Sequence, residues 1–274
     1  MSAAPEDSAN HCYRHPDRES YVLCQRCGRT ICPECMTQAP VGVICPECMR
    51  EARASAPRTR PALLRPSTGR PVATLGIIAV TVLIYLLQWI PALAVTQNLA
   101  YTPLLTVVEP WRMLTSVFVH SRGFIFHILL NMYMLWIFGQ LMEQLLGRAR
   151  FLALYLISGF AGSVGVLLLA PVNTVVVGAS GAIFGLMGAF LVIQRRLGGN
   201  TNQLLILLAI NLVIGFIPGL NIAWQAHVGG LVGGALVGLI YLETRQRRQN
   251  GLQIVLLVAL VVALVAASVA RVVL

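Results

Sequence analysis

Long apolar runs separated by short polar stretches fill the chain from position 72 onward. Each run approaches the roughly 20 residues that a helix needs to cross a hydrocarbon core of about 30 Å. The pattern predicts membrane helices at residues 72–92, 126–146, 150–170, 180–197, 203–218, 222–242 and 252–272. The fold class that we expect is therefore an all-α polytopic membrane protein.

The interval between the first two predicted helices is too long for a tight turn. It runs from Pro91 to Ile125 and contains Tyr101, Trp111 and scattered apolar side chains. Aromatic residues favour the membrane–water interface, and irregular backbone is tolerated at membrane depth only where protein or water satisfies it. We expect a partly embedded loop at one membrane face.

The first fifty residues differ from the rest, since they hold all seven cysteines and few apolar runs. With one histidine the cysteines form pairs of two-residue spacing: Cys12/His15, Cys24/Cys27, Cys32/Cys35 and Cys45/Cys48. Such pairs supply the ligands for two tetrahedral zinc ions. Disulfides or free thiols are the alternatives, but the cysteine count is odd and a cytosolic location disfavours disulfides. We predict a zinc-binding module at residues 1–50 with two structural ions.

Composition supports the membrane assignment, and charge adds an orientation. The chain is 57% hydrophobic and 11% charged, whereas a soluble domain carries about 25% charged residues. All twenty basic residues are arginine, and the net charge is +10. Most arginines lie between apolar runs, as the positive-inside bias requires, so we expect no nucleic-acid partner.

Predicted loops that contain arginines alternate with loops that contain none. Arginines fill the basic, Pro- and Ala-rich linker at 51–71 and follow the second, fourth and sixth predicted helices, whereas the loops near 171–177 and 218–221 have none. The exceptions are Arg112 and Arg122 in the long first loop. This predicts a multi-pass protein of the plasma membrane with a cytoplasmic N-terminus and, after seven helices, an external C-terminus.

Polar side chains inside the apolar runs mark a candidate site, because they are costly in hydrocarbon. His127 and Asn131 are four residues apart and share a helix face. Glycines follow His227 at intervals of four, which allows close approach of another helix. The small residues after Ser180 offer a matching face, so we expect the helix from Ser180 to pack against the helix with His227.

These residues suit acyl transfer. Histidine is the usual base that takes the proton of a serine nucleophile, which assigns those roles to His227 and Ser180. The helix N-terminus at Ser180 brings unpaired backbone N–H groups that can stabilise an oxyanion, and His127 and Asn131 can add donors. Each residue alone has a simpler explanation, such as a helix cap for Ser180. Their joint occurrence favours catalysis.

Several motifs resemble the rhomboid family of intramembrane serine proteases. They are Trp111-Arg112, His127-x-x-x-Asn131, Gly139-x-x-x-Glu143-x-x-x-Gly147, Gly178-Ala-Ser180-Gly181 and His227-x-x-Gly230-x-x-x-Gly234. The resemblance implies a six-helix protease core at 72–242, followed by a loop and a seventh helix at 243–274. It implies a Ser180–His227 catalytic dyad, an oxyanion hole of His127, Asn131 and the Ser180 backbone, and Gly178 as the residue that gives substrate room. Substrates would be single-pass membrane proteins cut near the outer face of the bilayer.

Two positions depart from the family pattern. The family often has tyrosine four residues after the serine, where this chain has Phe184, which can stack on the histidine but cannot donate a hydrogen bond. The loop between His120 and His127 is lengthened around Arg122, so the resemblance assigns no role to His120.

The N-terminal module resembles the B-box class of cross-braced zinc modules. That resemblance implies one ion held by Cys12, His15, Cys32 and Cys35, and another by Cys24, Cys27, Cys45 and Cys48. The last pair departs from the B-box pattern, where histidines are common, so pairing in sequence order stays open. We also expect a protein partner for this zinc-binding module.

Two other functions are compatible with parts of the sequence. An inactive rhomboid-like protein would bind membrane proteins or act in their quality control, but such relatives typically lack the serine or the histidine. A transporter using His127 and His227 as proton relays would need more intramembrane acids than Glu143. The sequence therefore favours a protease.

Overall fold

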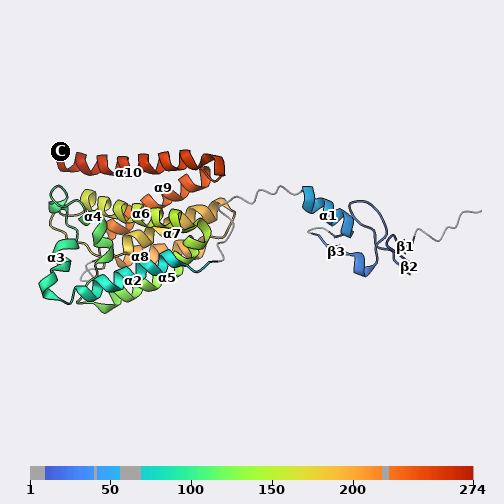
Figure 1. Cartoon of the computed structure of the whole chain (residues 1–274), viewed down its shortest axis with the longest axis horizontal. Coiled ribbons are helices and arrows are strands. Elements are labelled where there is room, and N and C mark those ends of the chain that lie inside the picture. The colour runs from blue at the N-terminus through green and yellow to red at the C-terminus, as the bar shows by residue number, and fades with distance from the viewer. Residues whose placement is uncertain (1–9, 40–41, 56–68, 218–221, 274) are drawn as a thin grey trace, which may run out of the picture. The chain divides into compact units, whose positions relative to one another are not determined.

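The computed structural model describes residues 10–39, 42–55, 69–217 and 222–273 of the chain (Figure 1). The chain divides into two compact units, Met1–Thr59 and Arg60–Leu274.

The first unit is built from very short elements. Strand β1 (His11–Cys12) pairs antiparallel with β2 (His15–Glu19), and β3 (Thr37–Gln38) pairs with β4 (Val43–Ile44). A 3₁₀ turn, η2 (Pro33–Cys35), and helix α1 (Pro46–Ser55) complete the unit. Ile31 is the one buried apolar residue here that is not a cysteine, among the residues that the structure describes. So small an apolar core cannot stabilise the unit by itself.

The second unit is a helical bundle. Its main helices are α2 (Val72–Leu87), α5 (Ile125–Leu146), α6 (Arg148–Leu169), α7 (Ser180–Arg196), α8 (Asn202–Ile214), α9 (Trp224–Glu243) and α10 (Asn250–Val273). In Figure 1, α10 (red) runs along one edge of this unit, and α2 and α5 run along the opposite edge. Each predicted apolar run contains a helix, so the expectation of a mostly helical second unit is confirmed. The end of the predicted helix at 203–218 and most of the predicted linker at 51–71 lie outside the described residues.

Fewer helices pass a length and hydropathy test for spanning than the seven predicted. Within the described residues α5, α6, α9 and α10 pass it, and α2 joins them only if the helical turn after its 108° bend is counted. Helices α7 and α8 have 17 and 13 residues, or about 26 and 20 Å of helix. Most of α7 is enclosed by protein, because its residues from Gly181 to Ala189 are all buried. A six-helix spanning core stays a prediction.

The interval between α2 and α5 folds into short helical turns. They are η4 (Pro91–Leu93), α3 (Val95–Leu99), η5 (Pro103–Leu105), α4 (Arg112–Thr115) and η6 (Ser116–Phe118). Arg112 is buried, pairs with Glu109 and donates hydrogen bonds to the carbonyl oxygens of Gln97 and Ala100. The interval is thus tied together by a buried cation, whereas Trp111 beside it is exposed.

Close helix packing follows the glycines. A Cβ added at Gly230 would overlap the carbonyl oxygen of Gly181, and one at Gly234 would overlap that of Gly185. Helices α7 and α9 therefore meet backbone to backbone, as the sequence predicts, and this contact sets the spacing of the two helices that carry Ser180 and His227.

The side chain of Glu143 is hydrogen-bonded within the fold. Its carboxylate accepts hydrogen bonds from the backbone N–H groups of Ala73 and Thr74, at 3.0 and 2.8 Å, and from the Thr74 hydroxyl at 2.8 Å. It thereby caps the N-terminus of α2, where a negative charge is favoured. This buried acid is therefore engaged in capping a helix within the fold.

Candidate functional site

Ser180 and His227 come together between α7 and α9. Ser180 is the first residue of α7, and His227 lies in the first turn of α9. The Ser180 Oγ and the His227 Nε2 are 2.9 Å apart, within hydrogen-bonding distance, and the histidine is 6% exposed. This is the geometry in which a histidine can take a serine proton.

An aromatic ring orients the histidine. The Phe184 ring stacks on the His227 imidazole with centroids 4.2 Å apart and planes 10° from parallel. The His227 Nδ1 is buried and has no hydrogen-bond partner among the described residues. The geometry is therefore that of a dyad, in which packing does what a third side chain does in a triad.

Gly178 leaves a small space beside the serine. Its φ of +122° is one that residues with a side chain rarely adopt, and a Cβ built there would lie 2.7 Å from the His127 Nε2 and 3.9 Å from the Ser180 Oγ. The space that the missing side chain leaves is thus flanked by the hydroxyl and by a ring nitrogen.

That ring nitrogen is a donor. The backbone N–H of Ser121 donates to the Nδ1 of His127 at 3.2 Å, so the ring proton of a neutral His127 lies on Nε2. An N–H group aimed at the space beside Gly178 suits a developing oxyanion. Gly178 also lies two residues before the start of α7 at Ser180, and the first backbone N–H groups of a helix have no partner within it.

The side chain of Asn131 is bound to the backbone of its own helix. It is buried on α5, and its Nδ2 donates to the backbone oxygen of His127 at 2.7 Å. In this arrangement the amide supports the helix turn that carries His127. Ser180, His227, Gly178 and His127 thus lie close together, and Asn131 is linked to them through His127.

Two residues that sequence reasoning left without a role pack against the site. His120 is 1% exposed, its ring centroid lies 5.1 Å from that of His127, and its Nε2 accepts a long hydrogen bond of 3.5 Å from the backbone N–H of Ala179. Gln88 binds the backbone of His120 through two hydrogen bonds, of 2.8 and 3.1 Å. The seven-residue spacing of His120 and His127 was the available signal for His120. Gln88 gave none, because it lay inside a predicted apolar helix.

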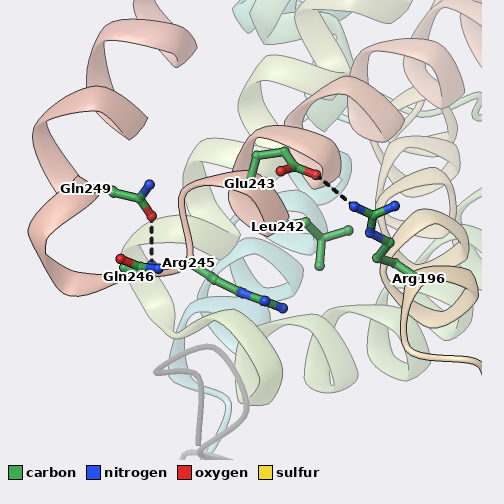
Figure 2. Close-up of a pocket in the computed structure, with 6 residues that line it drawn as sticks. All are labelled: Arg196, Leu242, Glu243, Arg245, Gln246 and Gln249. Carbon is green, nitrogen blue, oxygen red and sulfur yellow. Dashed lines mark hydrogen bonds and ion pairs between the residues drawn. The ribbon is translucent and has the colours of Figure 1, made fainter. Parts of the chain in front are cut away.

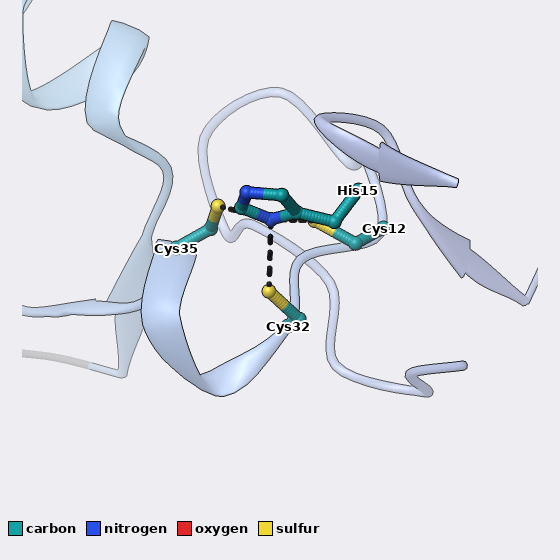
Figure 3. Close-up of side chains that lie close together, drawn as sticks. All are labelled: Cys12, His15, Cys32 and Cys35. Atoms are coloured by element: carbon teal, nitrogen blue, oxygen red, sulfur yellow. Dashed lines mark hydrogen bonds between the residues drawn. The ribbon is translucent and has the colours of Figure 1, made fainter. Parts of the chain in front are cut away.

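The cysteines and His15 form two compact clusters in the first unit. One contains Cys12, His15, Cys32 and Cys35, the other Cys24, Cys27, Cys45 and Cys48, and in each the ligand atoms lie within 4.8 Å of one another. Figure 3 shows the first, in which the Nδ1 of His15 lies 3.8, 3.3 and 3.4 Å from the sulfurs of Cys12, Cys32 and Cys35. A tetrahedral zinc ion would separate such atoms by about 3.6 Å, so the cluster fits a metal ion. The pairs interleave along the chain, which is the cross-braced grouping.

Hydrogen bonds favour the thiolate form of Cys24 in the second cluster, whereas burial raises the pKa of Cys48 there to about 12. Backbone N–H groups of Cys45 and Cys48 donate to the sulfurs of Cys24 and Cys45, at 3.2 and 3.3 Å. Burial raises the pKa of Cys24, but backbone hydrogen bonds at Cys27, Cys45 and Arg26 outweigh it and lower the pKa to about 6. A thiolate is the form of cysteine that binds metal.

The chain is similar in sequence to proteins of the rhomboid family. A family model described as the Rhomboid domain matches residues 107–244. The chain is 38% identical over 145 residues to YdcA of Bacillus subtilis, covering 51% of this chain and 71% of YdcA. It is 37% identical over 134 residues to Rhomboid protease GluP of Bacillus subtilis, covering 46% of this chain and 25% of GluP.

Similar proteins also occur in plants. The chain is 39% identical over 146 residues to RHOMBOID-like protein 6, mitochondrial, of Arabidopsis thaliana, and the match covers 50% of this chain and 46% of that protein. The chain thus spans less than half of the plant relative and of GluP but most of YdcA. A domain match over half of the chain, together with the apolar helices, shows that this membrane protein belongs to the rhomboid family.

Proposed function

We propose that this chain is an intramembrane serine protease in which Ser180 is the nucleophile and His227 is the general base. The observation that carries the proposal is the 2.9 Å contact between the Ser180 Oγ and the His227 Nε2, buried in a helical bundle. The name of its relative Rhomboid protease GluP supports the same reaction class.

The reaction would proceed in two steps. The His227 Nε2 takes the hydroxyl proton while the Ser180 Oγ attacks the carbonyl carbon of the scissile peptide bond. The protonated His227 then gives that proton to the leaving amine, which leaves an acyl-enzyme on Ser180, and a water activated by His227 hydrolyses the ester.

The tetrahedral intermediate needs donors at its oxygen. The His127 Nε2–H borders the space beside Gly178, and Ser180 begins α7, so its backbone N–H has no partner within the helix. We assign the oxyanion hole to these two groups, with Asn131 joining them once its amide turns from the His127 carbonyl oxygen. Preorganised donors of this kind each contribute about 10²–10³ in rate.

The substrates that we propose are single-pass membrane proteins, and the site is placed near the outer face of the plasma membrane. The arginine distribution supports this orientation, with a cytoplasmic N-terminus and an external C-terminus. We propose that residues 72–242 form the protease core and that the additional helix lies within residues 243–274.

The N-terminal module is proposed to hold two zinc ions. All-sulfur and three-sulfur, one-nitrogen ligand sets are typical of structural zinc, which would supply the folding energy that the small apolar core of this unit lacks. We therefore expect the module to be accessory to catalysis and to recognise a protein partner.

The direct test is cleavage of a model single-pass substrate by the purified full-length protein. We expect wild type to cleave it and Ser180→Ala to be inactive while keeping its thermal midpoint. Labelling by a fluorophosphonate probe should depend on both Ser180 and His227. Cleavage by Ser180→Ala would overturn the proposal, and a folded wild type that neither cleaves nor labels would favour an inactive membrane-protein binding factor.

A further inference from the structure

An open cavity of about 230 Å³ lies at the ends of α7 and α9 opposite to those that carry the dyad. Figure 2 shows its lining: Arg196, Leu242, Glu243, Arg245, Gln246 and Gln249. Arg196 ends the helix that Ser180 begins, so about 24 Å of helix separates the cavity from the nucleophile. Nothing in the proposed reaction uses it.

The cavity carries excess positive charge. The Nη2 of Arg196 pairs loosely with the Oε1 of Glu243, at 3.6 Å (Figure 2). Arg245 has no ion pair or hydrogen bond from its guanidinium within the part of the chain that the structure describes. The lining therefore holds two guanidinium groups and one carboxylate, and the guanidinium of Arg245 is available to a ligand.

The two glutamines add donors. The Gln246 Oε1 accepts a hydrogen bond from the Arg248 Nε at 2.8 Å, and the Gln249 Oε1 accepts one from the backbone N–H of Gln246 at 3.3 Å. With both carbonyl oxygens occupied, the side-chain NH₂ groups remain to donate. The lining thus presents donors and cations to whatever enters, which suits an anion with several acceptor oxygens.

The surroundings of the cavity indicate where that anion comes from. Arg195 is the neighbour of Arg196 in the last turn of α7, and such arginine-rich ends of membrane helices lie at headgroup level. Leu239, one helical turn before Glu243, is 44% exposed, and Leu252 at the start of α10 is 51% exposed. A polar, cationic cavity on helices that also carry exposed apolar side chains matches a lipid with an anionic head and apolar tails.

We propose that this cavity binds the phosphate group of an anionic phospholipid, with Arg196 and Arg245 as its cationic ligands. Guanidinium groups match phosphate in geometry and stay charged, and basic pockets between membrane helices bind anionic headgroups. Glu243 limits the affinity, because it competes with the phosphate for Arg196.

The test is lipid retention by the purified full-length protein. Dioleoyl phosphatidylglycerol and dioleoyl phosphatidylcholine are titrated in detergent, and bound lipid is read by native mass spectrometry. Wild type should retain phosphatidylglycerol preferentially. Arg196→Gln and Arg245→Gln should each weaken retention about fivefold. Arg195→Gln removes the same charge from the same helix turn without touching the cavity, and it should behave as wild type.

Three outcomes would overturn the proposal: equal retention of both lipids by wild type, equal losses in Arg195→Gln and in the cavity variants, or displacement of the lipid by millimolar inorganic phosphate. The last would assign the cavity to a soluble phosphate. Should either cavity variant fail to fold, Glu243→Gln decides, since removal of the competing carboxylate should raise phosphatidylglycerol retention. An unchanged or lower retention by Glu243→Gln would also reject the site.

Discussion

The Phe184 ring lies flat against the imidazole of His227, with 4.2 Å between ring centroids and 10° between ring planes. Both residues are buried, and the Nδ1 of His227 has no hydrogen-bond partner in the described parts of the chain. The direction of the His227 Nε2 toward Ser180 therefore depends on this stack and on the fit of α7 against α9. The aromatic ring of Phe184 thereby orients the histidine that we propose as the base.

Phe184→Leu removes the stack and keeps an apolar side chain of similar bulk. We expect kcat to fall about tenfold or more, because an imidazole that is free to turn spends less time in the productive geometry. The thermal midpoint should change little, since swaps that conserve core volume cost less than about 1.5 kcal/mol. Cleavage of a model substrate and fluorophosphonate labelling of Ser180 measure the effect.

Phe184→Tyr is the matched control, because it restores an aromatic ring at the same place. It should recover most of the labelling rate. A leucine variant as fast as wild type would show that the stack does not orient the base.

Gly178→Ala tests the space beside the nucleophile. The new Cβ would lie 2.7 Å from the His127 Nε2, in a backbone conformation with a φ of +122°. We expect a loss of about 10²–10³ in kcat, comparable to removal of an oxyanion donor. Gly123→Ala adds the same methyl group in the loop before α5, where a Cβ meets nothing within 4 Å, and should keep full activity. Equal activity of the two variants would mean that the oxyanion lies elsewhere.

The parts of this molecule that sequence predicted are those set by spacing along the chain. Apolar runs gave the helices, and four-residue glycine spacing gave the contact of α7 with α9, because both follow from helix periodicity. The same periodicity predicted that the helix beginning at Ser180 packs against the helix that carries His227. The depth of each helix in a bilayer does not follow from apolar length alone, as the enclosed 17-residue α7 shows.

The contacts that the sequence did not predict depend on the path of the loop between α2 and α5. Gln88 looked like an ordinary residue of a predicted helix at 72–92, but α2 ends at Leu87, and the Gln88 side chain turns to bind the backbone of His120. Such side chain–backbone contacts across thirty-two residues carry no periodic signal. For the same reason the burial of Arg112 could not be foreseen.

Gly230→Ala tests the packing of the two helices that carry the dyad. The added Cβ would overlap the backbone carbonyl of Gly181, which cannot move without shifting α7. We expect a cost of about 3 kcal/mol, at the upper end for overpacking, seen as a lower thermal midpoint in detergent, together with loss of cleavage. Gly76→Ala, exposed on α2 with nothing near its Cβ, should lower neither. A Gly230→Ala variant of wild-type stability would show that α7 and α9 do not meet this closely.

The pairing of ligands in the N-terminal module can be tested by removing one cysteine at a time. In the cross-braced grouping Cys32 shares its ion with His15, so Cys32→Ser should abolish the site with three sulfurs and one nitrogen and keep the all-sulfur site. Pairing in sequence order predicts the reverse. We expect wild type to bind two metal ions per chain, with cadmium-113 NMR shifts separating the two ligand sets.

Cys24→Ser completes the test, because the cross-braced grouping assigns it to the all-sulfur site. Its spectrum should lose that signal and keep the one from the His15 site. Substrate cleavage should persist in both variants, since the proposed protease site lies in the other unit. Loss of the all-sulfur signal in Cys32→Ser would establish sequential pairing. Loss of cleavage in a variant whose helical unit keeps its thermal midpoint would mean that metal binding in the module controls the protease.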